Sequence, residues 1–162
     1  MRPENFPTIR LAQLAMLIHD SSHLFSKVIE MHSITEIKAL LNVTANDYWH
    51  YHYRLDEPSP FKPKKLGEQM ENNILINTVV PAVFAFGYLH RKDSYQEKAF
   101  NWLAALSAES NSVIDRFSKA GISSQSSLDT QAVIELKTAY CDKRRCLDCA
   151  VGGYLLNRGI RG

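Results

Sequence analysis

The sequence has little of what marks several classes of protein. Its formal net charge is only +2 over 162 residues, which argues against a nucleic-acid binder that is basic over its whole surface. The first seven residues contain no apolar segment that could serve as a signal peptide. The most apolar stretch, residues 74–89, is shorter than the roughly 20 residues that span a bilayer, and Asn77, Pro81 and Gly87 interrupt it. We therefore expect no membrane insertion, and residues 74–89 should form the buried centre of the fold.

Common catalytic motifs are missing as well. The sequence contains no G-x-G-x-x-G, no G-x-x-x-x-G-K-[ST], no G-x-S-x-G and no H-E-x-x-H. A free-standing enzyme is therefore the less favoured interpretation. Only three cysteines are present, and without an export signal we expect them in the reducing cytoplasm, where disulfides are rare.

What the sequence does contain is a set of strong helix signals. With 45% hydrophobic and 22% charged residues, the chain is long enough for one compact core. A Ser or Thr followed three residues later by Asp or Glu marks a helix start, because each side chain bonds the other residue's backbone N–H. Four such pairs occur: Ser33/Glu36, Thr44/Asp47, Ser94/Glu97 and Ser126/Asp129.

Apolar spacing predicts further helices. The first should cover residues 8–18, with Leu11, Leu14 and Ile18 facing inward. Another should cover residues 109–120, and Gly121 should follow it as a left-handed cap. These patterns predict an all-α fold in which residues 1–162 form a single-domain orthogonal bundle of about seven helices.

Two segments interrupt this pattern. Residues 65–89 should form one kinked helix or two, broken near Pro81, although residues 74–80 also have the composition of a strand. Residues 56–63 hold three of the six prolines and should be an extended loop.

The strongest chemical feature is the motif Cys141-x4-Cys146-x2-Cys149, which holds every cysteine of the chain. Clustered thiolates are ligands for zinc and for iron–sulfur clusters. A tetrahedral zinc site needs a fourth ligand, which His52 or another histidine would supply. Alternatively, the three cysteines are small buried side chains at a helix corner.

A third interpretation of this motif is redox chemistry. Cys146 and Cys149 form a C-x-x-C pair, and a basic run of Lys143, Arg144 and Arg145 precedes it. Cations and a helix N-terminus would lower the pKa of a thiol there. The same run is a candidate contact for an anion or a nucleic acid, together with Lys137, Arg158, Arg161, Lys62, Lys64 and Lys65, although a solvated surface is the more common meaning of such charges.

Other polar residues have both a structural and a functional interpretation. His19 and His23 are four apart but should form a surface or core-edge pair at a helix end. The run from Tyr48 to Tyr53 should be an aromatic cluster that packs under the proline-rich loop. Two further groups are either structural or parts of a site. They are the N-terminal group Arg2, Glu4, Asn5 and Arg10, and the helix-associated group Asn77, Glu109, Asn111, Asp129 and Gln131.

Several segments, in order along the chain, resemble one known family. They are residues 2–15, Tyr48-Trp49 with His52-Tyr53, residues 77–87, residues 108–111, residues 129–132, and the cysteine motif with Tyr140. The chain resembles the C-terminal part of DUF2851, a bacterial family of unknown function. The resemblance implies a module of a longer family architecture and no particular activity.

These observations favour a non-catalytic helical module for interaction or scaffolding, whose partner is another protein domain or a second copy of the chain. The alternative is a nucleic-acid-associated module with a structural metal at the cysteines. Third is an enzyme built on buried polar residues around Asn77, Glu109 and Asp129.

Overall fold

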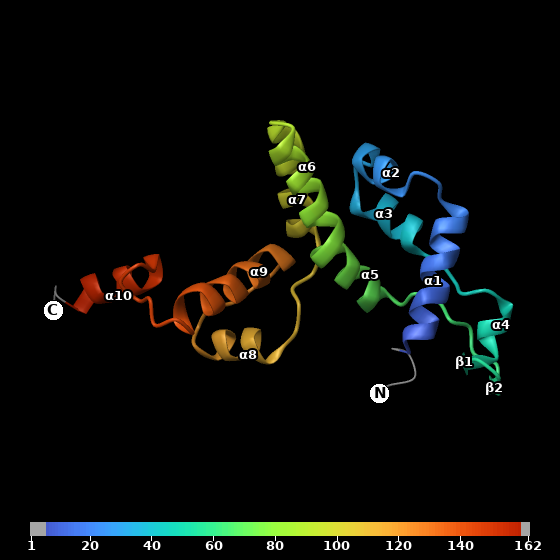
Figure 1. Ribbon diagram of the computed structural model, residues 1–162. Helices are drawn as coiled ribbons and strands as arrows, with labels where there is room; N and C mark the ends of the chain where they lie inside the picture. Colours follow the sequence, from blue (N-terminus) through green and yellow to red (C-terminus); the bar gives the residue numbers. More distant parts are fainter. Residues whose placement is uncertain (1–5, 160–162) are drawn as a thin grey trace. The chain divides into compact units, whose positions relative to one another are not determined.

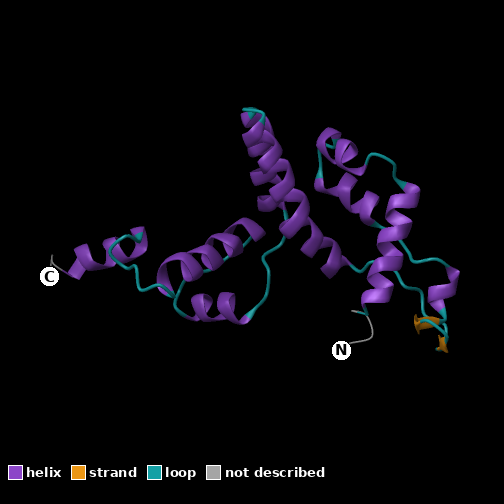
Figure 2. Cartoon of the chain, in the orientation of Figure 1, coloured by secondary structure: helices purple, strands orange, loops and turns teal. Residues whose placement is uncertain are grey.

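The structure is a computed structural model that describes residues 6–159. Helices account for most of this part of the chain, and its regular strands are limited to one small hairpin (Figure 2). The predicted all-α fold class is therefore confirmed. The chain divides into two compact units, Met1–Trp102 and Leu103–Gly162, which are described separately below. The predictions of a single domain and of orthogonal packing stay predictions.

The first unit contains most of the helices (Figure 1). In chain order its elements are α1 (Pro7–Asp20), α2 (Leu24–Glu30), α3 (Ile34–Leu41), α4 (Asp47–His50), β1 (His52–Arg54), β2 (Glu57–Pro58), α5 (Glu68–Ile74), the π-helix η2 (Leu75–Val79), α6 (Val80–Leu89) and the greater part of α7 (Asp93–Ala105). The second unit contains the end of α7 and then α8 (Ser112–Lys119), α9 (Ser127–Glu135), the π-helix η3 (Leu136–Cys141) and α10 (Ala150–Gly159).

The first helix buries a different face from the predicted one. Its buried residues are Ile9, Gln13 and Leu17, whereas the three expected core residues Leu11, Leu14 and Ile18 are exposed. The reason is Gln13, whose side-chain Nε2 donates to the Lys64 carbonyl at 3.0 Å and whose Oε1 accepts from Arg10 at 2.9 Å. A buried amide costs little once its hydrogen bonds are made. The prediction of the inward face was therefore wrong.

Residues 68–89 form one continuous helix through α5, η2 and α6, so the alternative of a strand at residues 74–80 is excluded. The wider π-turns end at Val79, two residues before Pro81, and the Val80 N–H donates to the Leu75 carbonyl. Proline crowds the carbonyl four residues back, and the widened turns accommodate it without a break. One face of this helix is buried, including Leu75 and Val83.

By length and composition, residues 68–89 also form a helix that could cross a membrane, the one such helix within residues 6–159. Core helices of soluble proteins pass the same test. The expectation of no membrane insertion stays a prediction.

Helix caps explain where several elements begin. Ser33 caps α3, and Ser126 caps α9 in a complete capping box with Asp129, as predicted. The other two predicted starts were wrong. Thr44 bridges Lys65 through its backbone, and α4 begins after Asn46. Ser94 lies inside α7, which begins at Asp93.

Long-range hydrogen bonds fix α7 against the segment around α2. The Lys98 ammonium donates to the Ile29 carbonyl at 2.7 Å, and the Trp102 indole N–H donates to the His32 carbonyl at 3.4 Å. Burial lowers the pKa of Lys98, while the nearby Glu36 carboxylate opposes that shift. On α7 itself, Ala99 and Trp102 are the buried residues.

The proline-rich loop packs on the aromatic run before it. The strands β1 and β2 pair antiparallel, with His52 opposite Pro58 and Arg54 opposite Glu57. His52 stacks on Tyr48 with ring centroids 4.0 Å apart. The predicted aromatic cluster is thus present in the structure.

In the second unit, the end of α8 has the predicted left-handed glycine. Gly121 has φ +90°, and the Ile122 N–H donates to the Phe117 carbonyl at 3.0 Å, which closes a Schellman motif. A second motif of the same kind ends η3. There the left-handed residue is Arg144 (φ 54°), and the Arg145 N–H donates to the Tyr140 carbonyl at 2.9 Å.

Candidate functional site

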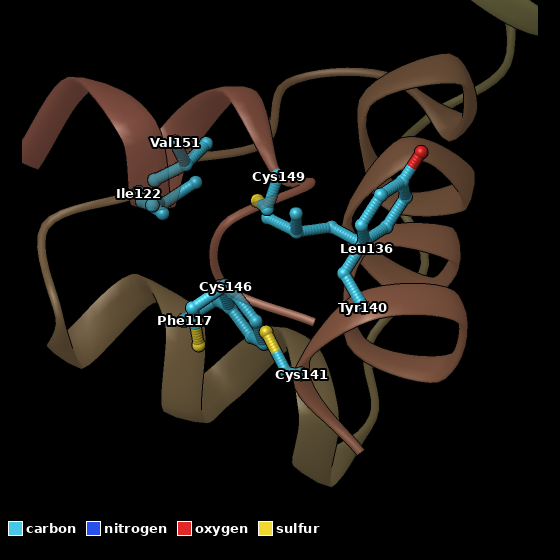
Figure 3. Close-up of a pocket in the computed structure, with 9 residues that line it drawn as sticks. Phe117, Ile122, Leu136, Tyr140, Cys141, Cys146, Cys149 and Val151 are labelled. Carbon is cyan, nitrogen blue, oxygen red and sulfur yellow. The ribbon is translucent and has the colours of Figure 1, made fainter. Parts of the chain in front are cut away.

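The cysteines of the second unit surround one small apolar pocket. It has a volume of about 200 Å³ and is lined by Phe117, Ile122, Leu136, Tyr140, Cys141, Cys146, Cys149, Val151 and Gly152. Figure 3 shows the three cysteines around this space, with the Tyr140 hydroxyl pointing away from them. Because its walls are almost entirely carbon and sulfur, the pocket suits a small apolar group or chemistry at sulfur.

The three thiols differ in exposure. Cys141 and Cys146 are exposed and Cys149 is buried, and all three are free. Cys141 is the last residue of η3, Cys146 lies in the turn that follows, and Cys149 directly precedes α10. The backbone therefore brings sulfur atoms to the pocket from two helix ends and one turn.

Gly152 allows the turn and α10 to approach each other closely. A Cβ built on Gly152 would lie 2.2 Å from the Cys146 carbonyl oxygen, which is well inside van der Waals contact. The neighbouring Gly153 has no atom within 4 Å of such a Cβ. Of these two glycines, only Gly152 is required by packing.

The basic run forms the turn between Cys141 and Cys146. Lys143, Arg144 and Arg145 are all exposed. Arg145 pairs with Asp148 at 3.1 Å and lies over the Tyr140 ring. That pairing leaves only Lys143 and Arg144 of the run as candidate contacts for an anion.

Other basic residues of the predicted set have different surroundings. Lys137 pairs with Asp142 at 2.6 Å. Lys64, in the first unit, is buried with its ammonium 3.7 Å from the centroid of the Tyr53 ring. Arg161 lies outside the described residues, and so does the side chain of Arg158. The nucleic-acid alternative stays a prediction.

The three cysteines line one pocket, but they are not grouped as the ligands of a metal ion would be. Within residues 6–159, no three His, Cys, Asp or Glu side chains are grouped so that they could hold a metal ion. His52 belongs to the first unit, where its Nδ1 lies 2.8 Å from the Tyr48 carbonyl oxygen. Zinc or iron–sulfur binding by Cys141, Cys146, Cys149 and His52 therefore gains no support from the described geometry and stays a prediction.

The other polar candidates mostly have structural partners. Asn111 caps α8, and its Oδ1 accepts from the Val113 and Ile114 backbone N–H groups. Glu109 accepts a hydrogen bond from Gln131, which ties the loop before α8 to α9.

Asp129 belongs to the capping box, and Asn77 is exposed and bonds Asn73. None of these residues lines the cysteine pocket. His19 and His23 are exposed, as predicted; His19 is in the last turn of α1, and His23 directly precedes α2. Arg2, Glu4 and Asn5 lie outside the described residues.

The first unit contributes a surface that the sequence did not predict. On α1, Leu11, Leu14 and Ile18 are 65%, 48% and 62% exposed. Their spacing of three and four residues places them on one face, which is rotated away from the buried face of Ile9, Gln13 and Leu17. We call Leu11, Leu14 and Ile18 the outer face of α1. The signal for it was present, because α1 carries two apolar stripes and only one of them can face its own core.

Fold and sites together define a helical protein with an exposed apolar helix face and a separate thiol-lined pocket. The comparison with protein families agrees with the resemblance found in the sequence. Residues 1–112 match the model of DUF2851, described as a protein of unknown function, and the chain belongs to this family. No curated protein and no solved structure matches the chain. The matched residues include the outer face of α1 and exclude all three cysteines.

Proposed function

We propose that this chain is a non-catalytic helical interaction module that docks another protein domain on the outer face of α1. The single observation that carries the proposal is the exposure of Leu11, Leu14 and Ile18 along one side of a 14-residue helix. Contiguous apolar surface on a protein marks an interaction site more often than scattered apolar residues do.

The chemistry of this face indicates the kind of partner. The 12 residues from Pro7 to Ile18 include one charged side chain, Arg10, which is half-buried and bonded to Gln13. A partner surface therefore needs apolar side chains and no matching charge. Helix packing of ridges into grooves suits a stripe of this spacing.

Energetics favour a partner domain over a second copy of the chain. Covering a large apolar side chain contributes at most about 1.5–3 kcal/mol, and each of these three is already partly covered. Two outer faces packed together would cover six such side chains, each a little more than half exposed on average, and would gain roughly 5–10 kcal/mol. That gain only matches the ~4–15 kcal/mol that association itself costs. A partner domain that brings a larger apolar surface would bind more stably.

The test places a photo-crosslinker on this face in cells. We expect Leu14→p-benzoylphenylalanine to give one discrete adduct with another protein. The adduct should disappear when Leu11 and Ile18 are also changed to Glu, and the exposed position Asn77 should give no such adduct. An adduct of twice the chain mass would identify a second copy instead. An adduct that survives the Glu substitutions, or no adduct at all, would contradict the proposal.

A further inference from the structure

We propose that Cys146 and Cys149 are a reversible dithiol–disulfide pair that exchanges with small soluble disulfides. This inference concerns the second unit and is independent of the proposed docking on α1. It assigns a modification site to the pocket.

The backbone already holds the two cysteines within bonding reach. The Cys149 N–H donates to the Cys146 carbonyl at 3.4 Å, which closes a four-residue turn. Such a turn keeps its first and fourth Cα atoms within about 7 Å. A disulfide needs Cα atoms about 4.4–6.8 Å apart. Closing the bond therefore requires side-chain rotation and little backbone movement.

Exposure gives the two thiols different roles. Cys146 is exposed and open to a reagent from solvent, whereas Cys149 is buried at 8% exposure beside the pocket. This is the arrangement of an attacking thiol, Cys146, with a resolving thiol, Cys149, behind it.

The pair lies where a helix begins and next to a basic turn. The Gly153 N–H donates to the Cys149 carbonyl at 2.8 Å, so Cys149 stands at the N-terminus of the ten-residue helix α10. Helix N-termini favour anions. Lys143 and Arg144 are exposed in the adjacent turn, and Asp148, which lies between the two cysteines, pairs with Arg145.

The exchange proceeds in two balanced steps. The Cys146 thiolate attacks one sulfur of the soluble disulfide R–S–S–R, the S–S bond breaks, and one RS⁻ leaves. The Cys149 thiolate then attacks the Cys146 sulfur, which releases the second RS⁻ and forms the internal disulfide. The two thiol protons end on the two RS⁻ groups, the cysteine pair loses two electrons, and the reagent gains them. The pocket beside the two cysteines gives room to the R–S group that stays bonded to Cys146 until the second step.

The third cysteine supplies the internal control. Cys141 also lines the pocket, but it lies at the end of η3 rather than in the four-residue turn. We therefore expect Cys141 to remain a thiol when the pair is oxidised.

The experiment treats the full chain with oxidised glutathione and maps the cysteine peptides by mass spectrometry. Two of the three thiols should be lost, and the wild-type map should show a bond between Cys146 and Cys149. Cys141→Ser should retain this reaction. Cys149→Ser should stop at a glutathione adduct on Cys146, and Cys146→Ser should form no internal disulfide.

Three results would overturn the inference. They are three free thiols after treatment, a wild-type bond that involves Cys141, or an internal disulfide that survives in Cys149→Ser. Mapping the wild-type chain needs no variant, so a variant that fails to fold leaves the test intact. Treatment in urea is the matched control, because unfolding should abolish the preference for Cys146 and Cys149.

Discussion

The two units leave apolar side chains uncovered in opposite ways. The first unit presents a convex helix face of Leu11, Leu14 and Ile18, while the second encloses a pocket of about 200 Å³ with three thiols on its wall. A convex face of aliphatic side chains suits another protein surface, because its whole gain comes from area covered. A small cavity with sulfur atoms suits a small molecule that reacts.

The family match separates the same two features. It covers the first unit and continues only through residues 103–112 of the second. The outer face of α1 is thus placed in the part of the chain that the family model describes. The thiol pocket belongs to the part beyond it.

The largest effect we expect distinguishes the two faces of α1. Leu17→Glu buries an unpaired charge at a position only 8% exposed and should cost more than about 4 kcal/mol of unfolding free energy. Leu14→Glu lies on the outer face and should stay within about 1 kcal/mol of the wild type. Urea titrations followed by circular dichroism measure both. Equal losses for the two variants would mean that the chain packs both faces internally.

A smaller effect should distinguish the two glycines beside the pocket. Gly152→Ala forces a Cβ against the Cys146 carbonyl and should destabilise the second unit by about 1–3 kcal/mol. Gly153→Ala has open space and should stabilise α10 by up to about 1 kcal/mol. Thermal unfolding of each variant gives the sign directly. A neutral Gly152→Ala would show that α10 does not pack on the cysteine turn.

The two left-handed helix ends of the second unit should respond in opposite directions. Arg144 adopts φ 54° without the freedom of glycine, so Arg144→Gly should gain about 1 kcal/mol. Gly121→Ala should lose about the same amount, since Gly121 has φ +90°. Denaturant midpoints with unchanged slopes would confirm both shifts. A loss for Arg144→Gly would instead show that the arginine side chain stabilises this turn.

The smallest effect concerns acid stability, with one helix cap in each unit. Hydrogen bonds from the His32 backbone and the Ser33 side chain lower the pKa of Glu36 below its ordinary 4.5. The Gln125 backbone N–H, and then Ser126, lower that of Asp129 below its ordinary 3.8. The unfolded carboxyl therefore takes up its proton first as pH falls.

Each cap contributes fully above the ordinary pKa of its acid, and the contribution is lost as pH falls through the lower, folded value. Glu36→Gln and Asp129→Asn should each remove part of the acid dependence of unfolding, measured between neutral pH and pH 2. If neither substitution changes the slope, the two carboxylates do not stabilise their helices.

Local signals predicted the features that depend on a few neighbouring residues. Ser33, Ser126 and Gly121 act within three or four residues of themselves, and the structure has all three in their predicted roles. Thr44 shows the limit of such signals, because its backbone bridges Lys65, 21 residues away in the sequence (65 − 44), and that pairing replaces the cap.

The inward face of α1 could not be predicted for the same reason. It depends on the hydrogen bond from the Gln13 side chain to the Lys64 carbonyl, which is 51 residues away in the sequence. From the sequence alone, the stripe of Leu11, Leu14 and Ile18 is the better candidate for the core, because the other stripe contains Gln13.

For the candidate site, the sequence pointed to the three cysteines as one motif with several possible roles. In the structure all three line one pocket. The turn hydrogen bond and the contact at Gly152 depend on how the chain folds back after η3. No local motif encodes that path, so the geometry that distinguishes Cys146 from Cys141 came only from the structure.

The central claim is that the outer face of α1 remains uncovered within the chain, and thiol labelling tests it most directly. In a background in which Cys141, Cys146 and Cys149 are all changed to Ser, Leu14→Cys and Leu17→Cys place one reporter on each face. We predict that a maleimide labels position 14 at nearly the rate of a free thiol and position 17 far more slowly. Equal protection at both positions would contradict the account, because the face proposed to dock another domain would already be covered.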